Sequence, residues 1–142
     1  MSPACDLLFV EDDLLLARAL LRSLRVRGIV ARHVSRCATA AALKGPFLLG
    51  IFDIDLPDGD GVELARLLRR RGVVSTALFY TACAHPLRLA KARDVGFVLA
   101  KSANLGALMD AVESRGHRAP TRGLSTESEQ RVGVAVGQRP WE

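Results

Sequence analysis

The 142-residue sequence has few aromatic residues, few cysteines and no long hydrophobic run. Five Phe, one Tyr and one Trp provide little surface on which nucleobases could stack. Cys5, Cys37 and Cys83 lack CxxC spacing, which argues against a disulfide framework or a zinc site and fits a reducing compartment. No apolar stretch has the roughly 18 residues that a membrane span needs, and no secretory signal is expected from the first residues. These absences favour a cytoplasmic location without membrane association.

The net charge of +5 comes mostly from arginine and could suit an acidic partner. The arginines recur at helical spacing opposite apolar stripes, however, which is typical of solvated helix faces. These are Arg18, Arg22 and Arg25 in one segment and Arg66, Arg69 and Arg70 in another. The length and a hydrophobic content of 49% indicate one globular domain with a substantial core.

Short apolar segments alternate with amphipathic ones along most of the chain. Strands are predicted at residues 7–10, 29–34, 48–52, 73–81 and 97–100. Helices are predicted from Leu14 to near Gly28, over residues 37–44, between Gly61 and Gly72, from Pro86 to about Asp94, and after Asn104. Five strands alternating with helices predict an α/β fold, a doubly wound parallel sheet between two helical layers.

The apolar stripes also predict which helix residues face the core. The expected inward residues are Leu14, Ala17, Leu21 and Leu24 in the first helix, Val62, Ala65 and Leu68 in the third, and Leu105, Leu108, Met109 and Val112 in the last. From residue 113 the composition shifts to Ser, Thr, Gly, Arg and Glu with little apolar periodicity. A domain over residues 1–112 is therefore predicted, followed by a flexible tail over residues 113–142 without a complete effector domain.

Polar side chains lie at the carboxyl ends of four of the predicted strands: Glu11 with Asp12, then Asp53, Thr81 and Lys101. The carboxyl ends of parallel strands lie at one edge of the sheet, so these residues are expected to converge. Clustered carboxylates repel one another unless a cation lies among them, and Mg²⁺ binds through such oxygens. An aspartate there can act as a nucleophile toward phosphorus, while a lysine and a hydroxyl stabilise the charge on the phosphoryl oxygens.

With these residues in place, the chain resembles the receiver domain of response regulators, the CheY-like phosphoacceptor module of two-component signalling. The resemblance spans about residues 6–112 and rests on four motifs in order: Leu8-Phe9-Val10-Glu11-Asp12-Asp13, Asp53-Ile54-Asp55-Leu56-Pro57-Asp58-Gly59-Asp60-Gly61, Phe79-Tyr80-Thr81-Ala82 and Lys101-Ser102. It implies a flavodoxin-like three-layer fold with strand order 2-1-3-4-5.

The resemblance also implies the chemistry of the chain. Asp53 would accept a phosphoryl group from a sensor histidine kinase or a histidine phosphotransfer protein. Pro57 and Gly61 match the loop that selects Asp53 over Asp55. The chain would be a stand-alone signalling domain, not an enzyme beyond slow self-dephosphorylation.

Further site residues follow from the same resemblance. Glu11 and Asp12 correspond to the acidic pair that holds Mg²⁺, with Asp53 and the backbone carbonyl of Asp55 completing the metal site. Thr81 corresponds to the hydroxyl that turns toward the phosphoryl group. Lys101 corresponds to the lysine that pairs with it.

Three positions depart from the family pattern. Lys101 is followed by Ser102 where a cis proline is common, so a non-proline cis bond is one expectation there. Val98 stands where the family has its aromatic switch residue, with Phe97 one position earlier. Asp55 adds a charge two residues after Asp53.

Two other functions remain open. Asp53-Ile54-Asp55-Leu56 also resembles the nucleophile motif of haloacid-dehalogenase-type Mg²⁺-dependent phosphatases, in which Asp55 would be the general acid. Residues 124–130 faintly resemble the start of a LuxR-type DNA-binding domain. Only 19 residues remain from Leu124, so a truncated remnant is the alternative and DNA binding is not expected.

Overall fold

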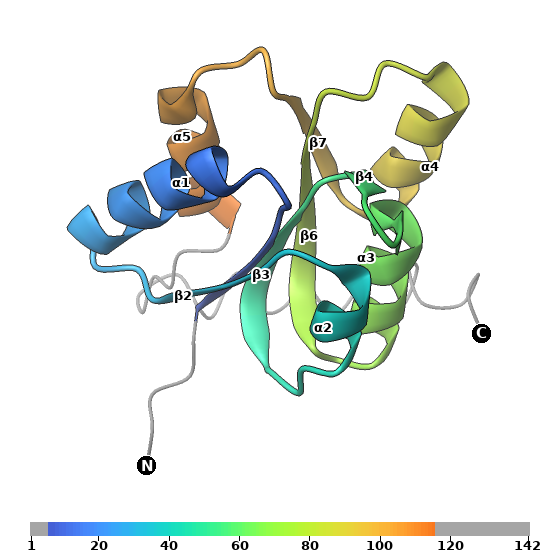
Figure 1. The fold of residues 1–142 in the computed structure, drawn as a ribbon, viewed down its shortest axis with the longest axis horizontal. Coiled ribbons are helices and arrows are strands. Elements are labelled where there is room, and N and C mark those ends of the chain that lie inside the picture. The colour runs from blue at the N-terminus through green and yellow to red at the C-terminus, as the bar shows by residue number, and fades with distance from the viewer. Residues whose placement is uncertain (1–5, 116–142) are drawn as a thin grey trace.

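A central sheet of five parallel strands organises the chain, in the computed structural model that describes residues 6–115 (Figure 1). The spatial order is β2-β1-β3-β6-β7, which equals the predicted 2-1-3-4-5 when the strands of this sheet are numbered in sequence. The strands are β1 (Leu7–Val10), β2 (Ala31–Val34), β3 (Phe47–Phe52), β6 (Val74–Thr81) and β7 (Phe97–Ala100). The predicted fold class is therefore confirmed.

Helices cover both faces of the sheet (Figure 1). Helices α1 (Leu14–Val26) and α5 (Leu105–Arg115) lie on one face. Helices α2 (Cys37–Ala41), α3 (Gly61–Arg70) and α4 (Pro86–Val95) lie on the other. The two-faced arrangement explains why strands such as β1 are apolar at every position, since both sets of side chains are buried.

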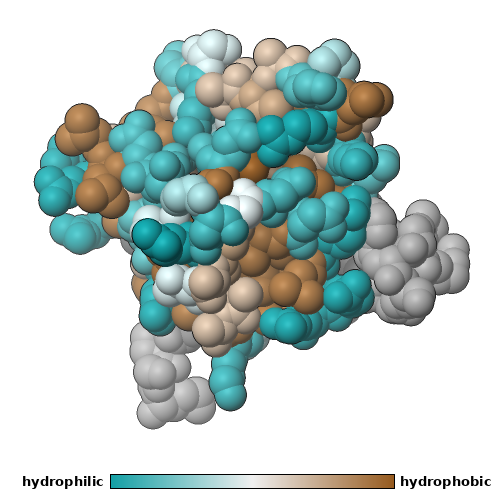
Figure 2. All heavy atoms as spheres, turned by 45° about the vertical axis from the view of Figure 1, so that its right-hand side comes forward, coloured by the Kyte–Doolittle hydropathy of each residue, from teal (hydrophilic) through white to brown (hydrophobic). Residues whose placement is uncertain are grey.

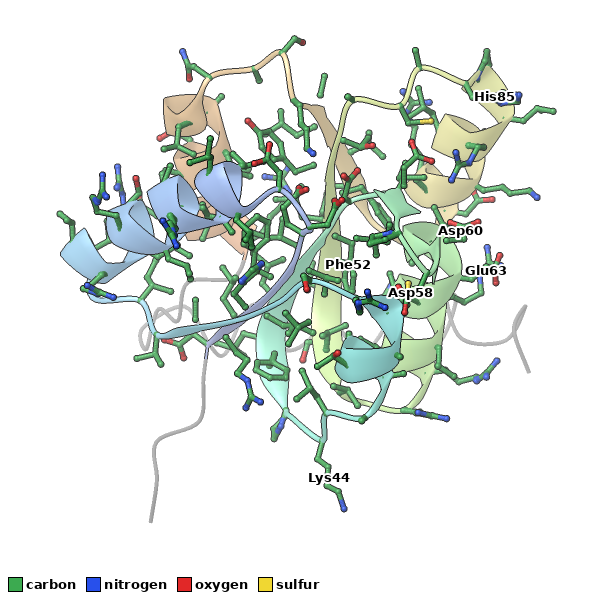
Figure 3. The ribbon with its side chains drawn as sticks, in the orientation of Figure 1. Lys44, Phe52, Asp58, Asp60, Glu63 and His85 are labelled. Carbon is green, nitrogen blue, oxygen red and sulfur yellow. The ribbon has the colours of Figure 1, made fainter. Side chains whose placement is uncertain are left out.

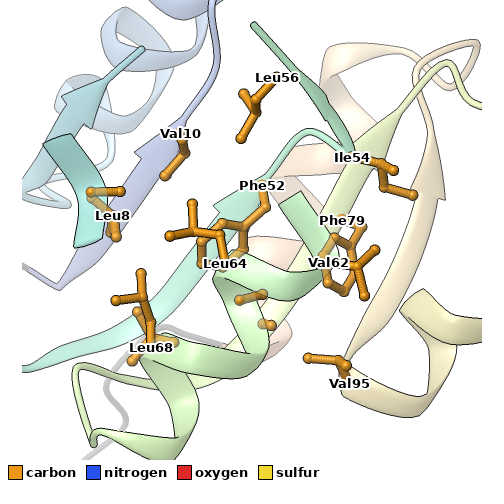
Figure 4. Close-up of a cluster of buried hydrophobic side chains, with 14 of the residues drawn as sticks. Leu8, Val10, Phe52, Ile54, Leu56, Val62, Leu64, Leu68, Phe79 and Val95 are labelled. Atoms are coloured by element: carbon orange, nitrogen blue, oxygen red, sulfur yellow. The ribbon is translucent and has the colours of Figure 1, made fainter. Parts of the chain in front are cut away.

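Each face has its own hydrophobic core. On the α2–α3–α4 face, Phe52 and Phe79 pack against Val62, Leu64 and their neighbours (Figure 4). On the other face, strand residues pack against the inward residues of α1 and α5, which include Ala17, Leu20, Leu24, Leu108, Met109 and Val112. Most predicted inward residues of α3 and α5 are buried, as expected.

Helix α1 differs from its predicted face. Leu20 is buried in place of Leu21, and Leu14 is 57% exposed. Ala17 and Leu24 belong both to the predicted apolar stripe, which contains Leu21, and to the observed one, which contains Leu20. The leucine-rich sequence therefore did not decide which of two adjacent helix faces is buried. The prediction that Arg66 and Arg69 are solvated is also wrong: the Arg66 side chain is 20% exposed, and the half-buried Arg69 donates from Nη1 to the carbonyl of Val95 at 2.6 Å.

The predicted second helix is shorter than expected, since α2 ends at Ala41. The acidic loop after β3 forms a small antiparallel hairpin of β4 (Asp55–Leu56) and β5 (Gly59–Asp60), which the sequence did not indicate. Helix α5 continues to Arg115, and the rest of the predicted tail, including residues 124–130, lies outside the described residues.

Gly61 closes the acidic loop against the end of β3. Its amide donates to the Ile54 carbonyl at 2.8 Å, and a Cβ at this position would lie 1.8 Å from the carbonyl oxygen of Asp53. No side chain fits at that distance, so glycine is required for α3 to begin directly beside Asp53. The glycine of the loop motif quoted in the sequence analysis is therefore required for steric reasons.

Among the helices of residues 6–115, none combines the length and apolar composition needed to span a bilayer. Figure 2, which brings the α4 side forward, shows a largely hydrophilic surface with separate hydrophobic areas.

Candidate functional site

The carboxyl edge of the sheet brings together the residues predicted from four strand ends. Asp53 follows β3 and is 7% exposed. The Thr81 hydroxyl, from the last residue of β6, donates to Asp53 Oδ1 at 3.0 Å. Lys101 follows β7, and its Nζ donates to Asp53 Oδ2 at 3.0 Å. Each oxygen of the Asp53 carboxylate is thus held by a different strand.

Glu11 lies on the other side of Lys101. Its Oε1 is 3.0 Å from Lys101 Nζ, and its side chain is 1% exposed. Burial raises the pKa of Glu11 above its ordinary value, although the neighbouring ammonium opposes this. Burial alone would lower the pKa of Lys101, but Glu11 and Asp53 together raise it. Lys101 is therefore a fixed positive charge between two carboxylates.

Asp12 completes an acidic cluster at the same edge. Carboxylate oxygens of Glu11, Asp12 and Asp53 all lie within 4.8 Å of one another. Lys101 alone does not balance three carboxylates. Glu11 Oε1 is buried and, despite the nearby ammonium, receives no hydrogen bond of acceptable geometry. A set of oxygen donors with excess negative charge suits a hard divalent cation such as Mg²⁺.

Asp55 does not join this cluster through its side chain. Its carboxylate accepts a hydrogen bond from Arg88 Nη1 on α4 and is 59% exposed. The carboxylate therefore points toward α4, and the proposed use of the Asp55 backbone carbonyl as a metal ligand stays a prediction.

Two further residues, Arg88 and His33, contact residues of the site and were not predicted from the sequence. Helix α4 provides Arg88, described above, and β2 provides His33, whose Nε2 lies 2.8 Å from the Glu11 carbonyl oxygen. The half-buried His33 ring also contacts the Phe9 ring, with centroids 5.7 Å apart. The only sequence signal for His33 was its place near the end of a predicted edge strand.

Asp58 ties the acidic loop to α2, beside which it lies in Figure 3. Its carboxylate accepts hydrogen bonds from the backbone amides of Cys37 at 2.7 Å and Ala38 at 3.0 Å. These bonds lower the pKa of Asp58 and satisfy amides at the start of the helix. The loop that follows Asp53 is thereby anchored on the side opposite to α4.

The Cys37 thiol provides a pH-dependent test of this arrangement. Burial, and then the negative charge of Asp58, raise the pKa of Cys37 to about 11. Roughly one thiol in a thousand is then ionised at pH 8, so iodoacetamide should alkylate Cys37 far more slowly than free cysteine. The rate should rise with pH until about pH 11. In Asp58→Asn the rise should shift to lower pH, as peptide mass spectrometry can follow, and a midpoint near pH 8.5 in the unaltered protein would contradict the assignment.

The departures from the family pattern have clear structural outcomes. Among the described residues the one cis peptide bond is Gly45–Pro46, so Lys101 and Ser102 are joined in trans. Val98 packs against the α2–α3–α4 core. Phe97 is 46% exposed, and the guanidinium carbon of Arg115 lies over its ring, 4.0 Å from the ring centroid.

Comparison with known proteins gives the same fold. No family model matches the chain. The chain is 35% identical over 78 residues to response regulator protein PmrA of Pseudomonas aeruginosa, which covers 54% of this chain and 35% of that protein. It therefore spans about a third of the length of that curated relative.

Three solved structures illustrate the likeness. A CheY-like receiver domain protein from Methanospirillum hungatei has a TM-score of 0.67 at 21% identity, covering 79% of this chain and 93% of that one. A two-component response regulator from Clostridium difficile has a TM-score of 0.68 at 24% identity, and the match covers 79% of this chain and 95% of that one. The receiver domain of Saccharomyces cerevisiae Ssk1 was solved with the histidine phosphotransfer protein Ypd1. It has a TM-score of 0.68 at 24% identity, and the match covers 82% of this chain and 91% of that one. The predicted resemblance to receiver domains is confirmed.

Proposed function

We propose that this chain, which has the fold of CheY-like receiver domains, accepts a phosphoryl group on Asp53 in two-component signalling. The observation that carries the proposal is the pair of contacts to the Asp53 carboxylate, from Thr81 on one oxygen and from Lys101 on the other. The donor would be the phosphohistidine of a sensor kinase or a phosphotransfer protein. The Ssk1 receiver, which shares this fold, was solved with such a protein.

The transfer would exchange one bond to phosphorus for another. An oxygen of Asp53 attacks the phosphorus atom, the phosphorus–nitrogen bond of the phosphohistidine breaks, and its electron pair returns to the imidazole. Lys101 and the Thr81 hydroxyl then stabilise the negative charge on the phosphoryl oxygens. Because Asp53 is buried, the reacting carboxylate meets few competing water molecules.

Glu11, Asp12 and Asp53 are the residues that would hold Mg²⁺, with the carbonyl of Asp55 as a further ligand. The bound ion would neutralise charge on the incoming phosphoryl group. This assignment is supported by the surplus of carboxylate over ammonium at the site and by the burial of Glu11, whose side chain is 1% exposed.

Incubation with acetyl phosphate and Mg²⁺ tests the proposal. Intact-mass spectrometry should show one added phosphoryl group, and removal of Mg²⁺ with EDTA should prevent the addition. Sustained hydrolysis of small phosphoesters without a stable adduct would instead favour the phosphatase reading with Asp53 and Asp55. The cytoplasmic location, the role of the tail and the lack of DNA binding stay predictions.

A further inference from the structure

The β4–β5 hairpin places two like charges directly opposite each other. Asp55 and Asp60 are register partners in this antiparallel pair. Opposed carboxylates destabilise such a pairing unless a cation neutralises them. The hairpin directly follows Asp53, so its conformation bears on the candidate site.

Arg88 is the cation that faces both carboxylates. From the first turn of α4, its Nη1 donates to Asp55 Oδ1 and its Nη2 lies 3.9 Å from Asp60 Oδ1. Asp60 is itself fixed, because its Oδ1 also accepts from the Val62 amide at 2.8 Å as the cap of α3. Figure 3 shows Asp60 near the start of α3, on the side toward α4.

The ion pair of Arg88 with Asp55 is the second of two contacts that join the segment from Thr81 to Arg88 to the residues around Asp53. At one end, Thr81 donates to Asp53 and accepts from the amide of Cys83 at 3.1 Å. At the other end, Arg88 binds Asp55, two residues after Asp53. The segment from Thr81 to Arg88 is therefore attached at both ends to residues 53–55.

We infer that Arg88 is a positioning residue for phosphoryl transfer to Asp53, because it draws the Asp55 carboxylate away from the site. The Arg88 and Asp55 side chains are 36% and 59% exposed, and ion pairs at such positions add little to the stability of a protein. The role of Arg88 is therefore to fix the position of the Asp55 carboxylate and to neutralise its charge. Without Arg88, the Asp55 carboxylate is released beside a cluster already rich in negative charge. An anionic phosphodonor is then repelled. The inference rests on the proposed function.

The test compares rates of Asp53 phosphorylation by acetyl phosphate at fixed Mg²⁺. Arg88→Ala should slow the reaction about fivefold, the order expected for a change of one unit charge near a partly solvated site. Adding Asp55→Asn to Arg88→Ala should restore most of the rate, because the released charge is gone. The slowing should also shrink at high salt. Arg93→Ala, which removes the same charge from an exposed position on α4, is the matched control.

Hydrogen exchange provides a readout that needs no phosphorylation. The Leu89 amide, which donates to the His85 carbonyl at 3.0 Å, should exchange about fivefold faster in Arg88→Ala than in Arg93→Ala. An unchanged rate of phosphorylation in Arg88→Ala, or a slowing that Asp55→Asn does not relieve, would overturn this inference and leave the proposed function intact. An unaltered protein that takes no label at all would overturn both.

Discussion

Asp53→Asn should reduce phosphorylation by acetyl phosphate to background. The substitution keeps the size of the side chain and an oxygen that can accept from Thr81, but it removes the anionic nucleophile. A carboxamide does not form an acyl phosphate. We therefore expect the rate of phosphorylation to fall by at least about a hundredfold, as it does when an enzyme loses its catalytic nucleophile. Intact-mass spectrometry of the protein incubated with acetyl phosphate and Mg²⁺ measures the effect.

The matched control for this variant is Asp94→Asn, which makes the same chemical change at an exposed position on α4. Its labelling should equal that of the unaltered protein. Persistent labelling in Asp53→Asn would place the acceptor elsewhere, and Asp55 would be the first carboxylate to examine. Loss of labelling in both variants would point to a general defect in folding.

Lys101→Met should have two effects of opposite sign. Lys101 is the cation that bridges the buried Glu11 and Asp53, so its removal leaves two carboxylates without a counter-charge. Phosphorylation should slow by about a hundredfold, as when one preorganised donor to a charged transition state is lost. Affinity for Mg²⁺ should rise, because the ammonium no longer competes for the same oxygens.

The loss of Lys101 should also lower the free energy of unfolding without Mg²⁺. Breaking a buried ion pair costs about 3–5 kcal/mol, and the 22% exposure of the Lys101 side chain reduces the expected value to about 2 kcal/mol. Adding Mg²⁺ should recover more stability in this variant than in the unaltered protein. Urea unfolding with and without the ion measures both, with Lys91→Met on the exposed face of α4 as the control. Equal stabilisation of the variants by Mg²⁺ would contradict the proposed competition.

The sheet could be predicted because its strands are unusually distinct in the sequence. The runs that became β1 and β3 are apolar at nearly every position and end in carboxylates, a pattern typical of strands buried on both faces. Parallel topology then places Glu11, Asp53, Thr81 and Lys101 at one edge, although they are widely separated along the chain. The convergence seen in the structure follows from that topology.

The rest could not be predicted, for physical reasons that differ from case to case. Strands β4 and β5 have two residues each, too few to show a periodic pattern. The pairing of Arg88 with Asp55 spans 33 positions and depends on how α4 packs, which no local pattern encodes. In α1, adjacent leucines offered two faces, and only packing against the sheet selected Leu20 over Leu21.

The most direct test of the account identifies the modified carboxylate itself. After incubation with acetyl phosphate and Mg²⁺, borohydride reduction converts an aspartyl phosphate to homoserine, which tandem mass spectrometry can locate. The tryptic peptide over residues 45–66 contains Asp53, Asp55, Asp58 and Asp60, so all four are read in one fragment series. We expect homoserine at position 53 alone. Homoserine at position 55, or an unmodified peptide from protein that carries the added mass, would contradict it.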